Sequence, residues 1–438
     1  MIRILILCLS SVLLWACQVA PQSNPEEDLD FVLQLLTPTD SLEEESKTAL
    51  FGMVTNGNYL ESLQDMLLRK ESLLKQYPPD MYYQALGTSL STVGEYQTVL
   101  ESWNRLMGEP PIKPKQDSLQ QVLQSVELKE AKETILAAAA DQQALMINEA
   151  HHVALHRVFT RSLLQDLYDL GYRYFAAETF SHGDIDRLNE EKFPLLKSGV
   201  YLCEPQYANL ARTALEIGFE LVAYEAPGSL NGSQRDSAQA RNLAQIFERD
   251  ADAKMLVHAG YAHIYERTNS EWIKMGQWFQ EFTGIDPWTI NQVAFTEKGD
   301  LDYENAYYTA LLANQKITSA AVPIQNDQFW MTARFQGLVD MLVMHPRTTY
   351  PNERVHWLQK EDYQKLKIPQ AKLEKALLIQ AFKASETERI DINQLVPVDH
   401  VLVKNRDRDQ YLFVPRYDKY VIRILDADSQ VLEQYMWE

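Results

Sequence analysis

The chain has 438 residues, of which 46% are apolar and 23% are charged, so it is long enough to fold into more than one domain with a real core. Its formal net charge of −20 at pH 7 argues against nucleic acid as a partner and against peripheral binding to anionic lipid. We interpret this charge mainly as a contribution to solubility.

The first 17 residues are an export signal rather than part of the fold. A short basic start precedes an apolar run at residues 4–15, which is too short to span a bilayer. The sequence Leu-Trp-Ala-Cys that ends at Cys17 resembles the lipobox of bacterial lipoproteins. This resemblance implies cleavage before Cys17, acylation of its thiol, and a lipid anchor in the bacterial cell envelope. Gln18 after the cysteine resembles lipoproteins of the outer membrane, facing the periplasm or the cell surface; an ordinary secretory signal with a chance cysteine is the alternative.

Cysteine usage agrees with this interpretation. Cys8 leaves with the signal and Cys17 carries lipid, so Cys203 remains alone and no intrachain disulfide forms. Cys203 is either a nucleophile or a small, partly buried apolar residue, and we favour the second.

Composition divides the rest of the chain into four parts. Residues 18–29 are polar and acidic and predict a flexible tether. The spacing of apolar residues predicts a helical cap or packing region over residues 30–135, an α/β core over 136–348, and a mixed module with antiparallel strands over 349–438.

The core opens with a strand, a helix and a strand. An apolar run at residues 144–147 precedes eighteen residues with helical spacing, which Gly171 ends, and a second strand follows at 172–177. This order is a βαβ unit and predicts a mostly parallel sheet flanked by helices.

Further elements of both kinds follow in the core and the last module. We expect strands at 219–224, 254–257, 288–295 and 339–344, and helices at 208–217, 233–249, 271–282 and 363–383. From residue 396, alternation of apolar and polar residues predicts antiparallel strands joined by turns at 407–409 and 426–428.

Acidic and imidazole side chains recur where the expected parallel strands end. Since ligands bind beyond the carboxyl ends of parallel strands, we expect these side chains to meet at one edge of the sheet. A histidine there can take a proton from water, and a carboxylate at its other nitrogen fixes its tautomer. The candidate residues are Glu149, His152, Glu178, Glu225, His258 and His263.

Other histidines have plainer interpretations. A single histidine at a strand end is more often a hydrogen-bonded surface group, as we expect for His156, His182, His356 and His400, while His345 stays open. His152 and His156 have the spacing of two ligands on a zinc-binding helix, but the surrounding sequence is not His-Glu-x-x-His. The sequence contains neither a phosphate-binding glycine-rich loop nor a Gly-x-Ser-x-Gly motif.

An ordered set of motifs across about half the chain resembles the erythromycin-esterase-like group, whose wider superfamily includes ChaN-type haem-binding lipoproteins and the Tiki/TraB proteins. The matching positions are Glu149-x-x-His152, Arg161, the strand ending in Glu178, Arg235 at the start of a helix, and the stretch 256–263 that ends in His263.

The resemblance implies a role for each residue. His152 would be the general base, Glu149 and Glu178 would orient it or the water, and His258 and His263 would position water or stabilise charge. Arg161, Glu225 and Arg235 would bind substrate. Arg157 competes with Arg161 for a place in the site, and Asn148 stands where the family usually has glycine.

The function implied is hydrolysis of an ester or related bond in a small-molecule substrate by activated water, in a membrane-anchored protein. The alternative is a haem- or iron-binding lipoprotein of the ChaN type without turnover. A metal-dependent protease of the Tiki type is a third reading. Whether a divalent metal, haem or no cofactor is used stays open at this point.

Overall fold

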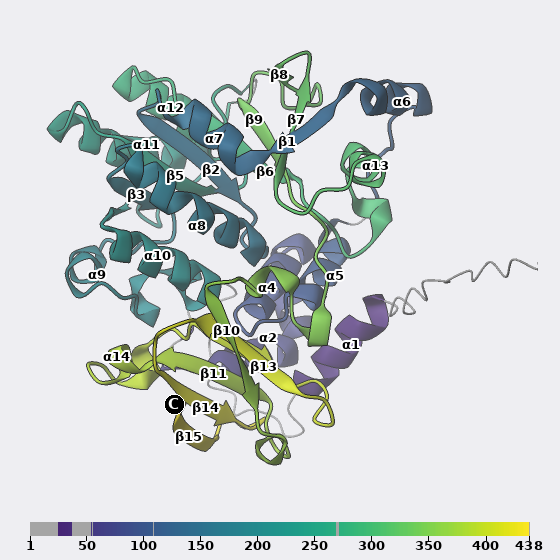
Figure 1. Ribbon diagram of the computed structural model, residues 1–438, viewed down its shortest axis with the longest axis vertical. Helices are drawn as coiled ribbons and strands as arrows, with labels where there is room; N and C mark the ends of the chain where they lie inside the picture. The colour runs from purple at the N-terminus through teal and green to yellow at the C-terminus, as the bar shows by residue number, and fades with distance from the viewer. Residues whose placement is uncertain (1–24, 37–53, 55, 108, 269–270, 438) are drawn as a thin grey trace, which may run out of the picture.

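The computed structural model describes residues 25–36, 54, 56–107, 109–268 and 271–437 (Figure 1). The predicted signal, the lipobox and Cys17 lie outside these residues, as does most of the predicted tether, and helix α1 (Pro25–Leu36) begins within its last part. Among the helices of the described ranges, none is both long and apolar enough to cross a bilayer.

Nine of the strands in the described residues form one mixed sheet, in the order β1-β7-β9-β6-β2-β5-β3-β4 with β8 paired to β7. The strands from β9 to β4 run parallel, whereas β1, β7 and β8 pair antiparallel. The parallel part confirms the predicted fold class. The strands are β1 (Glu127–Glu130), β2 (Ala144–Glu149), β3 (Tyr174–Ala177), β4 (Glu220–Ala223), β5 (Met255–Gly260), β6 (Trp288–Phe295), β7 (Ala321–Gln325), β8 (Gln328–Phe329) and β9 (Met341–Met344).

Helices cover both faces of this sheet, because the central strands are apolar on both sides. Leu145 and Ile147 of β2 pack in one cluster with α7 (Ala131–Ala139), α8 (Ala154–Asp169) and α10 (Pro205–Ile217). Ala144 and Met146 pack on the opposite face with α11 (Gly232–Arg249), α12 (Met275–Thr283) and α13 (Ala306–Asn314). Continuous burial along β2 is what a parallel strand covered on both faces requires.

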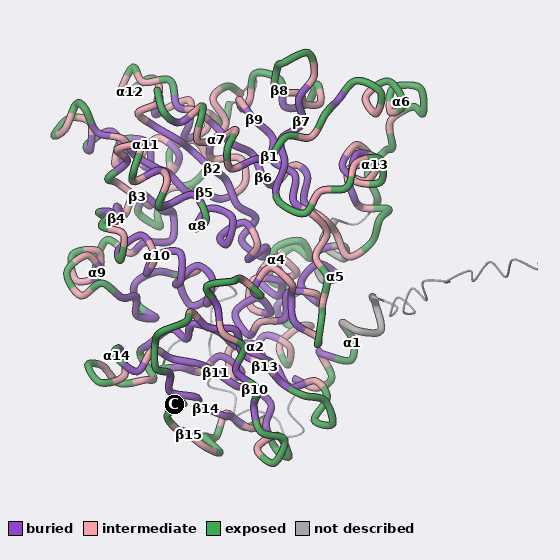
Figure 2. Tube along the Cα trace, viewed as in Figure 1, coloured by how far each residue is buried: buried purple, intermediate pink, exposed green. Residues whose placement is uncertain are grey.

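Two further regions lie against one side of this core (Figures 1 and 2). The N-terminal helices on this side are α1, α2 (Tyr59–Leu68), α3 (Lys70–Gln76), α4 (Pro79–Ser91) and α5 (Tyr96–Met107), whereas α6 (Gln116–Ser125) lies apart from them, next to α13. The C-terminal module has β10 (Tyr363–Ile368) paired with β13 (Gln410–Pro415), and a sheet of β12 (Asp399–Leu402), β11 (Leu378–Lys383), β14 (Tyr420–Leu425) and β15 (Val431–Trp437). One apolar cluster joins the N-terminal helices, the core and this module.

The helix predicted at 363–383 is wrong, because this segment forms β10 and β11. Pro369 lies between them, and proline neither donates a backbone hydrogen bond nor allows the preceding residue to stay helical. The chain also continues the core sheet in strands that were not predicted, namely β1, β7 and β8. All three pair antiparallel: β1 pairs with β7, which is distant in sequence, whereas β7 and β8 form a hairpin around the turn at 326–327.

A buried ion pair ties the C-terminal module to the core. Arg212 of α10 donates to both carboxylate oxygens of Glu386 in α14 (Ala384–Thr387), each at 2.7 Å, and to the carbonyl of Val396 at 2.6 Å. Both charged side chains are buried.

We therefore expect Arg212→Met to lower the free energy of unfolding by about 3–5 kcal/mol, since it leaves the Glu386 carboxylate buried without a counter-charge. Urea denaturation followed by circular dichroism measures this. Adding Glu386→Leu should recover much of the loss, and Lys113→Gln, at the exposed pair with Asp302, should cost at most about 1 kcal/mol. Equal losses in the single and double variants would contradict this account.

Candidate functional site

The ends of the central strands bring separate acidic and basic segments together. In the order β2-β5-β3-β4, Glu149 at the end of β2 is in register with Gly260 at the end of β5, and Ala177 of β3 is in register with His258. Glu178 therefore follows β3 directly beside the end of β5. The predicted convergence at this edge involves Glu149, Glu178, Glu225 and His263.

Glu149 is the centre of a buried charge network. Its carboxylate accepts from Nε and Nη2 of Arg157 at 2.6 and 3.0 Å, and from Nδ1 of His151 at 2.8 Å. Arg157 also donates to Glu204 at 2.9 Å and to the carbonyl of His151 at 2.8 Å. Burial would raise the pKa of Glu149, but Arg157 and His151 hold it well below the usual range.

Glu204 completes this network from the next helix. Its carboxylate caps α10 by accepting from the backbone N–H groups of Gln206 and Tyr207 at 3.0 and 2.9 Å. It also accepts from the hydroxyl of Tyr96, which is in helix α5, at 2.8 Å. The charge network thus links the core to the N-terminal helices.

His151 and Glu178 approach each other over Gly260. A β-carbon at Gly260 would lie 2.6 Å from Nε2 of His151 and 2.8 Å from Oε2 of Glu178, so these two atoms share one small space. Oε2 of Glu178 accepts from the backbone N–H of Gly260 at 2.6 Å. Nε2 of His151 has no hydrogen-bond partner among the described residues, and its ring stacks on Tyr201 with centroids 4.1 Å apart. Glycine at 260 is therefore required by this close approach.

Arg235 connects Glu178 to a second imidazole. Its guanidinium donates to Glu178 at 2.6 Å and to both oxygens of Glu225 at 2.9 and 2.5 Å, and its Nη1 lies 3.0 Å from Nε2 of His263. Nδ1 of His263 contacts the Asp236 carboxylate closely. Asp236 is itself fixed by the indole N–H of Trp272 and the backbone N–H of Met275.

Neighbouring charges shift the pKa values of Glu178 and His263 in this second part of the site. Burial would raise the pKa of Glu178, but His263, His151 and Arg235 lower it to about 2. Burial would lower the pKa of His263, but the hydrogen bond to Asp236 and the charge of Glu178 raise it above its ordinary value. The imidazoles of His151 and His263 thus each have a carboxylate at Nδ1. Nε2 of His151 faces Glu178, and Nε2 of His263 faces Arg235, which binds Glu178.

The backbone is strained at Tyr261, directly after the end of β5. Tyr261 has φ of +46°, which is unfavourable for a residue with a β-carbon. Its N–H donates to the carbonyl of Glu149 at 2.8 Å, and the side-chain amide of Asn148 donates to its carbonyl at 2.6 Å. Asn148, where the resembling family has glycine, therefore fixes the end of β5 against β2.

Three of the predicted site residues lie elsewhere. His152 is buried under Trp103, with ring centroids 3.6 Å apart, and neither of its ring nitrogens has a hydrogen-bond partner among the described residues. Arg161 is 5.4 Å from the ring centroid of Tyr363 in the C-terminal module. His258 is inside β5, where Nδ1 is 3.1 Å from the Tyr207 hydroxyl and burial lowers its pKa to about 4. Between the two competing arginines, Arg157 is the one that contacts the charge network.

His151 and Asp236 are not among the predicted site residues. A usable signal was present for His151, because it is two residues past Glu149 and a nearly extended chain directs such residues to the same side. Asp236 directly follows Arg235 in the first turns of α11, and only the position of His263 reveals its function.

Water reaches the site from one side. Side-chain exposure is 29% for both Arg235 and Glu225 and 14% for His263, but 7% for His151 and 1% for Glu149. A substrate must therefore approach past Arg235 and His263.

Metal binding was left open by the sequence. Among the described residues, no group of three or more histidine, cysteine, aspartate or glutamate side chains has the arrangement of a metal site. Cys203 is buried, and burial raises its pKa to about 12, which suits a small apolar residue better than a nucleophile.

Comparison with known proteins gives few matches. No family model and no curated protein matches the chain. Among solved structures, similarity is found to the type III effector HopBA1 (TM-score 0.28, 11% identity, 41% of this chain and 94% of that one). It is also found to a structure of bacterial protein toxins (0.30, 16%, 52% and 47%) and to RRSP, a MARTX toxin effector domain from Vibrio vulnificus (0.29, 17%, 56% and 49%). In the last two cases the chain spans about half the length of its match, and similarity of this size carries no argument about function.

The close approach at Gly260 predicts a local effect. We expect Gly260→Ala to displace the His151 ring and to lower the free energy of unfolding by about 1–3 kcal/mol, because the new methyl group overlaps buried atoms. Imidazole NMR signals and urea denaturation measure the two effects. Gly228→Ala is the control, since a β-carbon there meets nothing within 4 Å. An unchanged His151 signal in Gly260→Ala would contradict the geometry.

The lowered pKa of Glu178 predicts a pH dependence of stability. The folded pKa is about 2 against an ordinary value of 4.5, so its stabilising contribution is present above pH 4.5 and is lost as the pH falls toward 2. That contribution is about 3 kcal/mol. Urea denaturation between pH 7 and pH 2 should show a shallower acid loss for Glu178→Gln than for wild type, and parallel curves would contradict the prediction.

Proposed function

We propose that the protein is a hydrolase that activates water between His151 and His263 to cleave an ester or related bond. The observation that carries the proposal is a pair of imidazoles, each held at Nδ1 by a carboxylate, on either side of Glu178: Nε2 of His151 lies with Oε2 of Glu178 over Gly260, and Nε2 of His263 is 3.9 Å from Oε1 of Glu178. A carboxylate–imidazole pair of this kind is the standard means of making a general base. The role that the resemblance gave to His152 is therefore assigned here to His151.

The two imidazoles have different tasks in this proposal. Nε2 of His151 takes a proton from water while the water oxygen attacks the carbonyl carbon. His263, whose imidazolium is favoured by Asp236 and Glu178, gives its Nε2 proton to the leaving oxygen when the carbon–oxygen bond breaks. Arg235 holds Glu178 in place, and its guanidinium would stabilise a developing oxyanion beside it.

The lipid anchor inferred at Cys17 would place this activity in the bacterial cell envelope, on the outer membrane, with small molecules as substrates. The alternative from the same resemblance is haem or iron binding without turnover. A haem titration separates the two: a Soret shift that His263→Ala weakens, with no hydrolysis of any ester, would favour the alternative.

The matched pair His151→Ala and His152→Ala tests the assignment. We expect His151→Ala to lower kcat about 100- to 10,000-fold on any ester or lactone that the protein hydrolyses, because it removes the general base. His152→Ala should stay within about tenfold of wild type, since its ring is stacked under Trp103. Hydrolysis of a panel of esters and lactones, with and without chelator, is the measurement. The reverse order of the two variants would refute the assignment.

The raised pKa of His263 predicts the alkaline limb of the pH–rate profile. If His263 acts as an acid, kcat/KM should fall as the pH rises through a value above 6.5, the ordinary pKa of histidine. Asp236→Asn removes the carboxylate that favours the imidazolium, so this limb should move to lower pH. An alkaline limb that is unchanged in Asp236→Asn would show that another group titrates there.

A further inference from the structure

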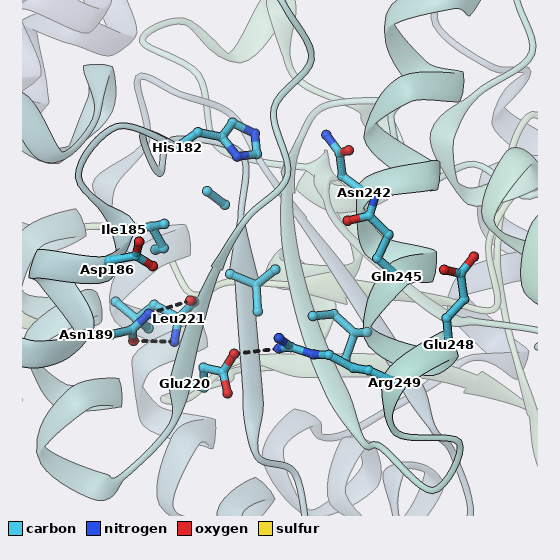
Figure 3. A pocket seen from close by; sticks show the side chains of 13 residues that line it. His182, Ile185, Asp186, Asn189, Glu220, Leu221, Asn242, Gln245, Glu248 and Arg249 are labelled. Atoms are coloured by element: carbon cyan, nitrogen blue, oxygen red, sulfur yellow. Dashed lines mark hydrogen bonds and ion pairs between the residues drawn. The ribbon is translucent and has the colours of Figure 1, made fainter.

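A groove lies over the outer edge of β4, between α9 (Ile185–Glu191) and α11. Its volume is about 630 Å³, and we call it the β4 groove; its lining includes His182, Asp186, Asn189, Ala223, Gln245 and Glu248. In Figure 3 the side chains of Asp186 and Asn189 lie on one wall, and those of Asn242, Gln245 and Glu248 lie on the other. The core sheet thus has a wide opening along its last strand.

The backbone of β4 offers one unused pair of hydrogen-bonding groups in this groove. β4 is the last strand of the sheet, so its outer edge has no neighbouring strand among the described residues. The side-chain amide of Asn189 donates to the Leu221 carbonyl at 2.9 Å and accepts from the Leu221 N–H at 2.8 Å. Residues two apart in a strand point their backbone groups to the same side, so Ala223 presents its N–H and C=O to the same edge. No described residue binds them.

The groove carries unbalanced negative charge. Arg249 is neutralised by Glu220 at 2.5 Å, but the carboxylates of Asp186 and Glu248 have no ion-pair or hydrogen-bond partner among the described residues. They come from opposite walls of the groove. Their charges give the groove a negative potential, which favours a positively charged ligand.

One end of the groove leads to the candidate site. His182 binds the carbonyl of Glu225 at 2.8 Å, and Asn242 donates to the carbonyl of Tyr224 at 3.0 Å, so these two side chains close the upper end. The side chain of Glu225 binds Arg235 on the other side of this point. A ligand paired with Ala223 is therefore two residues along the chain from Glu225, and His182 and Asn242 separate it from the acidic and imidazole cluster.

We propose that the β4 groove binds an extended peptide segment that carries a lysine or arginine side chain. One peptide residue pairs with the N–H and C=O of Ala223, as the amide of Asn189 already pairs with Leu221, and the basic side chain is attracted by the negative charge that Asp186 and Glu248 add to the groove. Binding of this kind does not depend on hydrolysis at the neighbouring site.

The test is binding of a fluorescein-labelled peptide, Thr-Val-Thr-Lys-Thr-Val-Thr, to the full chain, followed by fluorescence anisotropy. We expect saturable binding that weakens with salt and that the same peptide with glutamate in place of lysine lacks. Asp186→Asn combined with Glu248→Gln should weaken binding about tenfold or more. Glu374→Gln combined with Glu388→Gln, two exposed carboxylates on the C-terminal module, is the charge-matched control and should have no effect.

Ala223→Pro tests the backbone contact. Proline removes the outward N–H of an edge strand without removing a bond to β3, so the fold should tolerate it while peptide binding falls. Circular dichroism and urea denaturation check the fold, and if this variant unfolds, the charge variants alone decide. Equal binding of the lysine and glutamate peptides, full binding by the charge variants, or no binding at all would overturn the proposal. So would concentration-dependent self-association that only Ala223→Pro abolishes, since the groove would then hold a second copy of the chain.

Discussion

The buried guanidinium of Arg157 is the interaction on which the rest of the site depends. It lies between Glu149 at the end of β2 and Glu204 at the start of α10, and it also holds the carbonyl of His151. A buried ion pair adds little stability compared with apolar side chains, but losing one partner leaves a buried charge and costs several kcal/mol. The three segments that supply these groups are therefore fixed relative to one another.

The orientation of His151 follows from this constraint. Its carbonyl is held by Arg157 and its Nδ1 by Glu149, so the ring has one orientation with Nε2 over Gly260. His263 is held by Asp236 in the same manner, although Asp236 comes from α11 and not from the end of a strand. Two unrelated parts of the chain thus build the same carboxylate–imidazole unit on either side of Glu178.

Much of the fold follows from local sequence patterns, and the site follows from them only in part. Helix α8 and its end at Gly171, with φ of +95°, were predictable because periodicity and a left-handed glycine are local signals. The convergence of Glu149 and Glu178 was predictable from strand order in a βαβ unit. Which of His151 and His152 lies in the site could not be predicted, because this depends on Trp103, a residue of the N-terminal helices that covers His152. Strands β10 and β11 were missed for a similar reason, since their pairing partners are distant in sequence.

The N-terminal helices and the loop before α10 determine from which side a substrate can reach the two imidazoles. Tyr96 binds Glu204, Trp103 covers His152, and Tyr201 stacks on His151, so this side of the site is closed by aromatic side chains. The open side is bounded by Arg235 and Glu225, and Glu225 adjoins the upper end of the β4 groove. In the proposed hydrolysis, a scissile bond would therefore enter along the edge of the sheet formed by β4. Specificity should then depend on α9 and on the part of α11 that follows Arg235 and Asp236, which lie outside the motifs that define the site.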